Sequence, residues 1–214
     1  MPTLLYLHGF RSSPQSAKAR ATALRVAQLN AQREALGEPA VRWLCPQLPP
    51  SPRDAMDLCL DLLGSVKGDD LRLIGSSLGG FYATWLAHTL QARAALINPA
   101  VDPARDLCGQ IGSLAAWHDP TLRFDFTAAH VDELRALQVG DLSAPVPEPQ
   151  RYVVLIAQGD EVLDWRDMAA RYRGAHCTVL PGGDHALSDY ADRHLDTVLR
   201  WCLAPARPIE TPLP

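Results

Sequence analysis

The sequence has little that would cross-link the chain, anchor it in a membrane or export it. No apolar run approaches the about 20 residues of a membrane-spanning helix, and the N-terminus lacks the charged region and cleavage site of a signal peptide. The five cysteines are an odd number without a C-x-x-C pair, and they are Cys45, Cys59, Cys108, Cys177 and Cys202. Such spacing indicates neither a disulfide framework nor a metal site. We therefore expect buried thiols in a cytoplasmic protein without membrane insertion.

An excess of basic charge is also missing. The chain has 20 Lys and Arg against 24 Asp and Glu, for a net charge of −4, and no long block of like charge. This balance argues against a nucleic-acid partner and leaves a small-molecule partner by elimination. The 214 residues, 47% of them hydrophobic, are enough for one domain with a substantial core.

What the sequence does contain is an alternation of short apolar runs with longer segments of helical period. Some runs, such as Tyr152–Ala157, are continuously apolar, which is typical of strands covered on both faces of a parallel sheet. Helical patterns cover 15–36, the residues after Pro52, 81–90 and a stripe from Leu187 to Cys202. The expected strands are Thr3–Leu7, Val41–Leu44, Leu71–Ile74, Ala94–Ile97, Tyr152–Ala157 and Cys177–Leu180. The pattern predicts the α/β class, with a mostly parallel sheet of about six strands and helices on both faces.

Two segments depart from this alternation. Residues 102–150 are too long for an ordinary connection and include a predicted helix at Ala128–Leu137. We predict that they form either a lid-like insertion over a site or a packed excursion. The main domain is expected to span 1–204, and the proline-rich tail, 205–214, is expected to be poorly ordered.

The strongest chemical signal is Gly75-Ser76-Ser77-Leu78-Gly79, between a predicted strand and a predicted helix. G-x-S-x-G in this context is the nucleophile elbow, a sharp turn that projects the central serine beyond the sheet. Side chains at the two glycines would collide with neighbouring backbone, and the amide groups at the start of the helix face the developing negative charge. Only Ser77 has the required spacing, so we assign it as the nucleophile rather than Ser76.

A nucleophilic serine needs a histidine base and an acid that orients it, and after such an elbow the acid precedes the histidine. His185 follows the last predicted strand in a glycine-containing loop and is the expected base. Asp160 follows the strand Tyr152–Ala157 and a glycine, which makes it the expected acid, with Asp164 as runner-up. Glu161 is expected to face solvent. The other histidines lie in predicted regular elements or precede the acid candidates.

An oxyanion hole requires two preorganised backbone amides. We expect one from Leu78, directly after the nucleophile, and one from Phe10, which follows Gly9 in the turn after the first strand. His8 has no second ligand at metal spacing and is expected to brace this loop.

Candidate substrate-binding residues flank these groups. Arg11 is placed to meet an anionic part of the substrate, although a solvated loop arginine has the same sequence signature. The aromatic residues of the insertion are candidates for an apolar pocket or for the core, and they include Trp117, Phe124 and Phe126.

Together these residues resemble the α/β-hydrolase superfamily and, more narrowly, the bacterial YqiA-type esterases of the UPF0227 group. The matching stretches are Leu4–Pro14, Gly75–Ala83, Asn98–Ala100, Gly159–Asp164 and Gly182–His185. The resemblance implies a single-domain α/β-hydrolase fold and hydrolysis of carboxylic esters or acyl thioesters without a cofactor. We therefore expect a Ser77–His185–Asp160 triad that forms an acyl-enzyme. The alternatives are another triad-dependent hydrolysis, of a peptide or C–C bond, and a catalytically silent fold that binds ligands.

Overall fold

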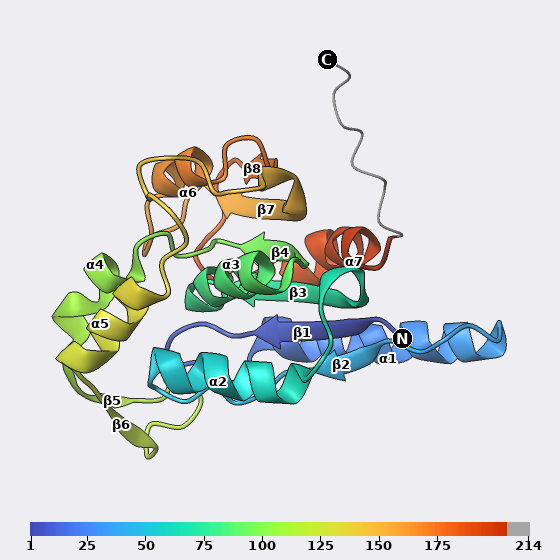
Figure 1. Ribbon diagram of the computed structural model, residues 1–214, viewed down its shortest axis with the longest axis horizontal. Coiled ribbons are helices and arrows are strands. Elements are labelled where there is room, and N and C mark those ends of the chain that lie inside the picture. Colours follow the sequence, from blue (N-terminus) through green and yellow to red (C-terminus); the bar gives the residue numbers. More distant parts are fainter. Residues whose placement is uncertain (205–214) are drawn as a thin grey trace.

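Six strands form one parallel sheet, in the order β2-β1-β3-β4-β7-β8 (Figure 1). This is a computed structural model that describes residues 1–204, so the predicted tail, 205–214, lies outside the described residues. The strands are β1 (Thr3–Leu7), β2 (Arg42–Leu44), β3 (Leu71–Ser76), β4 (Arg93–Ile97), β7 (Tyr152–Ala157) and β8 (His176–Leu180). The predicted fold class is confirmed. Two strands have the predicted bounds, and the other four differ from them by one or two residues.

Helices cover both faces of the sheet because its central strands are apolar on both sides. In β1 all five residues are buried, with Leu5 and Leu7 packing on one face and Leu4 and Tyr6 on the other. The first face is covered by α2 (Pro52–Leu63), α3 (Leu78–Leu90) and α6 (Trp165–Arg171). The second is covered by α1 (Ala17–Ala35) and α7 (Leu195–Leu203).

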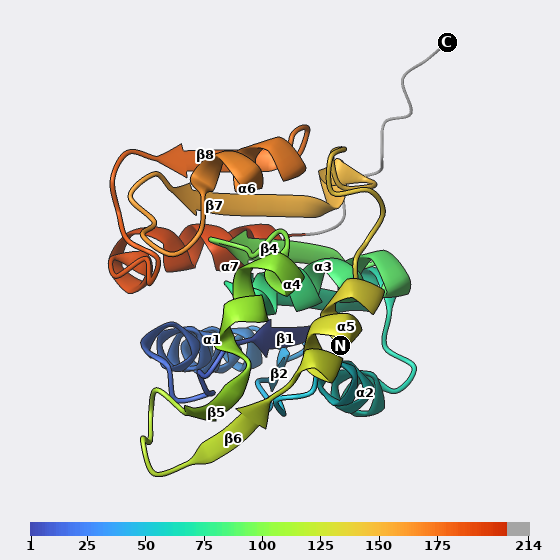
Figure 2. The same cartoon turned by 90° about the vertical axis from the view of Figure 1, so that its left-hand side faces the viewer.

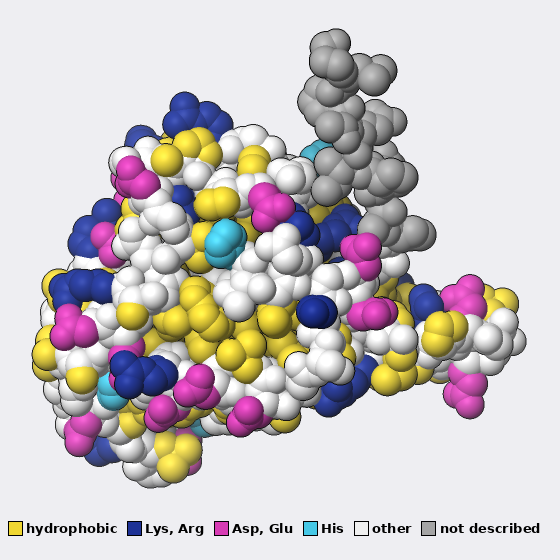
Figure 3. Space-filling view, viewed as in Figure 1, with side chains coloured by type: hydrophobic (Ala, Val, Ile, Leu, Met, Phe, Trp, Pro, Cys, Tyr) yellow, Lys and Arg dark blue, Asp and Glu magenta, His cyan; other side chains and the backbone are white. Residues whose placement is uncertain are grey.

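The helix starts are set by local capping. The Ser16 hydroxyl accepts a hydrogen bond from the Ala19 amide at the start of α1, and Ser51 caps α2 in the same way, with Pro52 in the first turn. Figure 3 looks onto the face that carries α2 and α3, where hydrophobic side chains gather between the two helices. No helix within residues 1–204 is long and apolar enough to cross a membrane.

The insertion holds structure that the sequence pattern did not predict. It consists of α4 (Pro103–Leu107), a two-stranded antiparallel hairpin of β5 (Gly112–Ala115) and β6 (Arg123–Phe126), and α5 (Ala128–Ala136). Only α5 was expected, because α4 is too short to show a helical period. Figures 1 and 2 show these elements gathered beyond the end of the sheet toward which the parallel strands point. That end is where α/β proteins place their ligands.

Two structural expectations drawn from the sequence were wrong. Cys59 and Cys202 are buried, but Cys108 and Cys177 are exposed. Cys108 begins a short turn of the insertion, and Cys177 lies on β8, an edge strand whose residues are mostly exposed. The last apolar stripe is also not one helix. Leu187 is buried in a left-handed conformation, a π-helical turn follows at Tyr190–His194, and α7 begins only at Leu195.

Candidate active site

Ser77 lies in the tight turn between β3 and α3. Its φ of 57° and ψ of −123° are a strained conformation for a residue with a side chain, and its backbone is held from two sides. The Ser77 amide donates to the Ile97 carbonyl at 3.0 Å, and the Ser77 carbonyl accepts from the Ala100 amide at 3.0 Å. The turn therefore holds a half-buried hydroxyl at the carboxyl end of the central strands.

The glycines around Ser77 are required for close packing. A Cβ atom at Gly75 would lie 2.2 Å from the Gly79 carbonyl oxygen, and one at Gly79 would lie 2.0 Å from the Leu7 carbonyl oxygen. Both neighbours are backbone atoms, which cannot rotate away. The steric argument made from the motif therefore holds in the structure, and it explains why α3 can start so close to β1.

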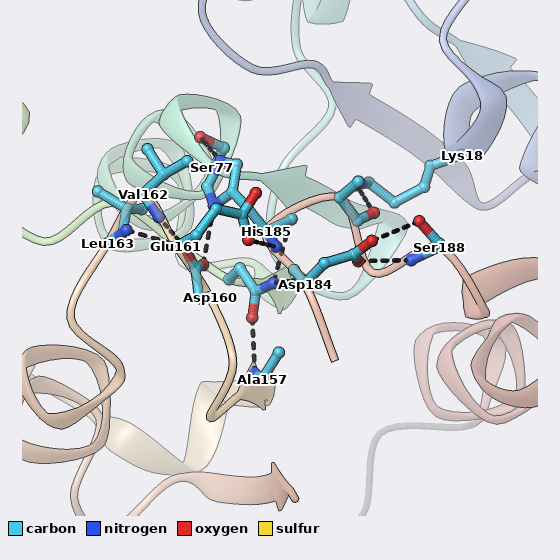
Figure 4. Close-up of polar contacts among 12 residues, drawn as sticks. Lys18, Ser77, Ala157, Asp160, Glu161, Val162, Leu163, Asp184, His185 and Ser188 are labelled. Atoms are coloured by element: carbon cyan, nitrogen blue, oxygen red, sulfur yellow. Dashed lines mark hydrogen bonds and ion pairs between the residues drawn. The ribbon is translucent and has the colours of Figure 1, made fainter. Parts of the chain in front are cut away.

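His185 and Asp160 approach Ser77 in a chain of hydrogen bonds (Figure 4). The His185 Nε2 atom lies 2.9 Å from the Ser77 Oγ atom, and its Nδ1 atom lies 2.8 Å from the Asp160 Oδ2 atom. The Asp160 side chain is fully buried, and its Oδ1 atom accepts from the amides of Val162 and Leu163 at 2.9 and 2.8 Å. The two loops after β7 and β8 thus deliver the two side chains to the serine.

This arrangement sets the proton positions on the imidazole. An ionised carboxylate only accepts hydrogen bonds, so the Nδ1 atom of His185 must carry its proton toward Asp160. The Nε2 lone pair then faces the Ser77 hydroxyl. Such a chain is chemically able to remove the serine proton during attack on an acyl carbon.

Asp164, the runner-up acid, has another contact. Its carboxylate caps the start of α6 by accepting a hydrogen bond from the Arg166 amide at 2.9 Å, and 52% of its side chain is exposed. The geometry therefore brings Asp160, not Asp164, to the imidazole.

Two further residues hold the His185 loop and were not identified from the sequence. Glu161 is exposed, as expected, but its Oε2 atom accepts a hydrogen bond from the His185 amide at 3.0 Å. Lys18 of α1 donates to the Ala186 carbonyl from the other side of the loop. Burial lowers the pKa of Lys18 to about 8, against the opposing effect of the Asp184 and Asp160 carboxylates. No sequence signal marks Lys18, because its target lies 168 residues away.

The loop after β1 lies directly against Ser77. A Cβ atom at Gly9 would be 3.2 Å from the Ser77 Cβ atom. The His8 ring is buried and accepts a hydrogen bond from the Leu48 amide at 3.1 Å while its Nδ1 atom contacts the Gly9 carbonyl, so it braces the loop. Burial lowers the pKa of His8, which keeps the brace neutral. Outside the regular helices and strands of residues 1–204, the amides of Phe10 and Leu78 donate no backbone–backbone hydrogen bond, and their role as oxyanion donors stays a prediction.

A cavity of about 760 Å³ opens over these groups. Its walls include Ser77, His185, Arg11, Lys18 and Trp117. The Arg11 guanidinium stacks on the Trp117 ring at 3.8 Å, and its Nε atom donates to the Ala115 carbonyl at 2.7 Å.

The other aromatic candidates lie elsewhere. Phe124 lines a neighbouring cavity of about 600 Å³, which shares Phe10 and Leu78 with the first. Phe126 is 2% exposed and belongs to the core, where it packs edge-on against Phe10. Within the described part of the chain, no group of three or more His, Cys, Asp or Glu side chains is placed to hold a metal ion.

Comparison with known families and structures gives consistent results. A model of the family described as "Uncharacterised protein family (UPF0227)" matches residues 3–202. Among solved structures, a protein of Agrobacterium vitis S4 assigned as a hydrolase is similar with a TM-score of 0.67 and 19% identity, over 94% of this chain and 88% of that one. Mouse alpha/beta hydrolase domain-containing protein 10 is similar with a TM-score of 0.64 and 17% identity, over 94% and 89% of the two chains.

Est1E from Butyrivibrio proteoclasticus, whose structure has ferulic acid bound, is similar with a TM-score of 0.59 and 14% identity, over 94% of this chain and 86% of that one. At these identities the likeness is one of fold. The α/β-hydrolase fold therefore extends over nearly the whole chain.

Proposed function

This chain belongs to the UPF0227 family and has the α/β-hydrolase fold, and on that premise we propose that it is a serine hydrolase of carboxylic esters or acyl thioesters. The observation that carries the proposal is the continuous hydrogen-bond chain from Ser77 through His185 to the buried Asp160. A catalytically silent fold has no need of such a chain or of the strained Ser77 backbone.

The mechanism proposed is a two-step acyl transfer. His185 removes the Ser77 proton as the Oγ atom attacks the acyl carbon, and the Phe10 and Leu78 amides stabilise the oxyanion. Protonated His185 then gives its proton to the departing alcohol or thiol, which leaves the acyl group on Ser77. Water attacks this acyl-enzyme by the same route, which releases the acid and restores the serine hydroxyl.

Labelling with a fluorophosphonate tests the nucleophile directly. We expect the wild-type protein to form a covalent adduct at Ser77, identified by mass spectrometry, and the Ser77→Ala variant to form none. Equal labelling of the two proteins would contradict the proposal. A panel of p-nitrophenyl esters and acyl thioesters of varied chain length then compares the ester and thioester activities and gives the preferred acyl length.

The charges around the cavity favour a substrate with an anionic group. Asp106 on the cavity wall is paired with Arg105 at 2.8 Å. Within residues 1–204, neither Arg11 nor Lys18 forms an ion pair with a carboxylate. The cavity therefore carries two cations without a direct counter-charge in a protein whose net charge is −4.

We expect a pH-dependent preference for the p-nitrophenyl monoester of adipic acid over neutral p-nitrophenyl hexanoate. Lys18 is charged below its pKa of about 8 and neutral above it, so the ratio of the two kcat/KM values should fall as the pH rises from 7 to 9. The expected fall is roughly three- to fourfold, because ~1 kcal/mol from one ion pair is about a fivefold effect and Lys18 loses about four fifths of its charge between these two pH values. Taking the ratio cancels the titration of the catalytic groups, because both esters share them.

Two variants distinguish the effect of Lys18 on this ratio from the effect of Arg11. Lys18→Met should lower the ratio and remove its pH dependence. Arg11→Met should lower the ratio equally at every pH, because a guanidinium keeps its proton throughout this range. A ratio that is independent of pH in the wild-type protein, or unchanged in Lys18→Met, would show that Lys18 does not meet the substrate.

A further inference from the structure

Asn98, the first residue after β4, is a fully buried polar side chain outside the proposed triad. It is 0% exposed, and its φ of 42° places it in the left-handed region that asparagine tolerates better than most residues. Burying an amide is unfavourable unless its donors and acceptors find partners. The partners of Asn98 therefore show what this side chain is for.

The amide group of Asn98 links two loops of the site. Its Oδ1 atom accepts a hydrogen bond from the Ala157 amide at 2.8 Å, at the end of β7 and three residues before Asp160. Its Nδ2 atom donates to the carbonyls of Asp184 and His185 at 3.0 and 3.1 Å. One side chain thus joins the strand end that precedes the acid to the backbone of the base.

The same short segment also holds the nucleophile. The carbonyl of Ile97 accepts from the Ser77 amide, and the amide of Ala100 donates to the Ser77 carbonyl, both at 3.0 Å. Residues 97–100 therefore contact all three chain segments that carry Ser77, Asp160 and His185.

We propose that Asn98 is a positioning residue that sets the distance of His185 from Ser77. The role rests on the proposed function, since it acts through the base of that reaction. His185 follows Gly182 and Gly183, both at positive φ, so its loop needs external contacts to keep one conformation. Two of those contacts, from Glu161 and Lys18, come from side chains that solvent reaches, whereas the Asn98 side chain is fully buried.

An asparagine is required because the task needs an acceptor and two donors in one short side chain. An aspartate keeps the size and the acceptor for the Ala157 amide but loses both donors to the 184 and 185 carbonyls. An apolar residue leaves all three backbone groups without a partner. The variant Asn98→Asp therefore removes the link to the base and keeps the link to β7.

Asn30 of α1 provides a matched control. Its amide also bridges backbone groups, because Oδ1 accepts from the Val41 amide at 2.8 Å and Nδ2 donates to the Val41 carbonyl at 2.9 Å. It lies outside both cavities, next to the start of β2. Asn30→Asp makes the same chemical change as Asn98→Asp away from the triad.

The test combines the rate of fluorophosphonate labelling at Ser77, the far-downfield proton resonance of the His185 Nδ1–H group, and urea unfolding. We expect Asn98→Asp to label on the order of 10²-fold more slowly, since a displacement of about 1 Å has effects of this size, and to lose the resonance. Asn30→Asp should lose stability but keep both signals. If Asn98→Asp does not fold, Asn98→Gly, which permits the positive φ and buries no charge, takes its place.

The outcomes distinguish this role from the proposed function. A folded Asn98 variant that labels at the wild-type rate and keeps the resonance, even with lower stability, would show a structural role only and overturn the inference while the hydrolase proposal stands. A wild-type protein that is not labelled would contradict the hydrolase proposal. The resonance would then still decide whether Asn98 sets the His185 geometry.

Discussion

Replacing Ser77 and His185 by alanine together should lower kcat no further than replacing either one alone, by roughly 10⁴–10⁶-fold in each case. The reason is the 2.9 Å contact between the Ser77 Oγ and His185 Nε2 atoms. Each side chain depends on the other for the same step, so once the nucleophile is gone the base has no proton to remove. The measurement is kcat for a p-nitrophenyl ester in the wild-type protein, the two single variants and the double variant.

A serine and a histidine outside the site provide controls for this double-mutant cycle. Ser65 and His88 are exposed and line neither cavity, so Ser65→Ala, His88→Ala and their combination should retain the wild-type kcat. Multiplicative losses in the Ser77 and His185 double variant would mean that the two residues act in separate steps, which would contradict the proposed triad.

The parts of the fold that were predictable are those in which one local pattern decides the structure. Tyr152–Ala157 is apolar at every position, and the structure buries it at every position between β4 and β8. The elbow was predictable for a steric reason, because Gly75 and Gly79 leave no room for a Cβ atom. Such constraints lie within a few residues of the chain and can be read from composition and spacing.

The parts that escaped prediction depend on contacts between distant segments. The two strands of the β5 and β6 hairpin have only four residues each. β6 alternates between polar and apolar residues, but β5 begins with Gly112 and Ser113 and does not, so the pattern was too short to predict a pair of strands. Asn98 was visible as a polar residue after a buried strand, but its partners lie 59 to 87 residues away. Glu161 was expected only to face solvent, and its contact with the His185 amide requires the two loops to meet.

The assignment of the acid also depended partly on sequence position and partly on the folded loop. Sequence position placed both Asp160 and Asp164 at the end of β7, and only the folded loop separates them. The Val162 and Leu163 amides turn the chain around Asp160 and point its other oxygen at the imidazole. Asp164 is carried past the site to the start of α6.

This separation leads to a second expected result of large size. Asp160→Asn should lower kcat by about 10⁴-fold, while Asp164→Asn should keep kcat within a few fold of the wild-type value. An asparagine amide at position 160 donates to the His185 Nδ1 atom, which moves the imidazole proton to the Nε2 atom. The protonated Nε2 atom can then no longer accept the Ser77 proton. At position 164 asparagine is as good a helix cap as aspartate, so α6 should begin at the same residue with little change in stability.

The pair of variants is matched in chemistry, since each converts one carboxylate to an amide within the same loop. Urea unfolding of both proteins shows whether a loss of activity comes from the missing carboxylate or from a destabilised loop. If Asp164→Asn were the slow enzyme and Asp160→Asn the active one, the hydrogen bond at 2.8 Å would not be the one used in catalysis. The expected order follows from burial as well as distance. The Asp160 side chain is fully shielded from water next to the imidazole, whereas the half-exposed Asp164 carboxylate would be screened by solvent even if a loop movement brought it closer.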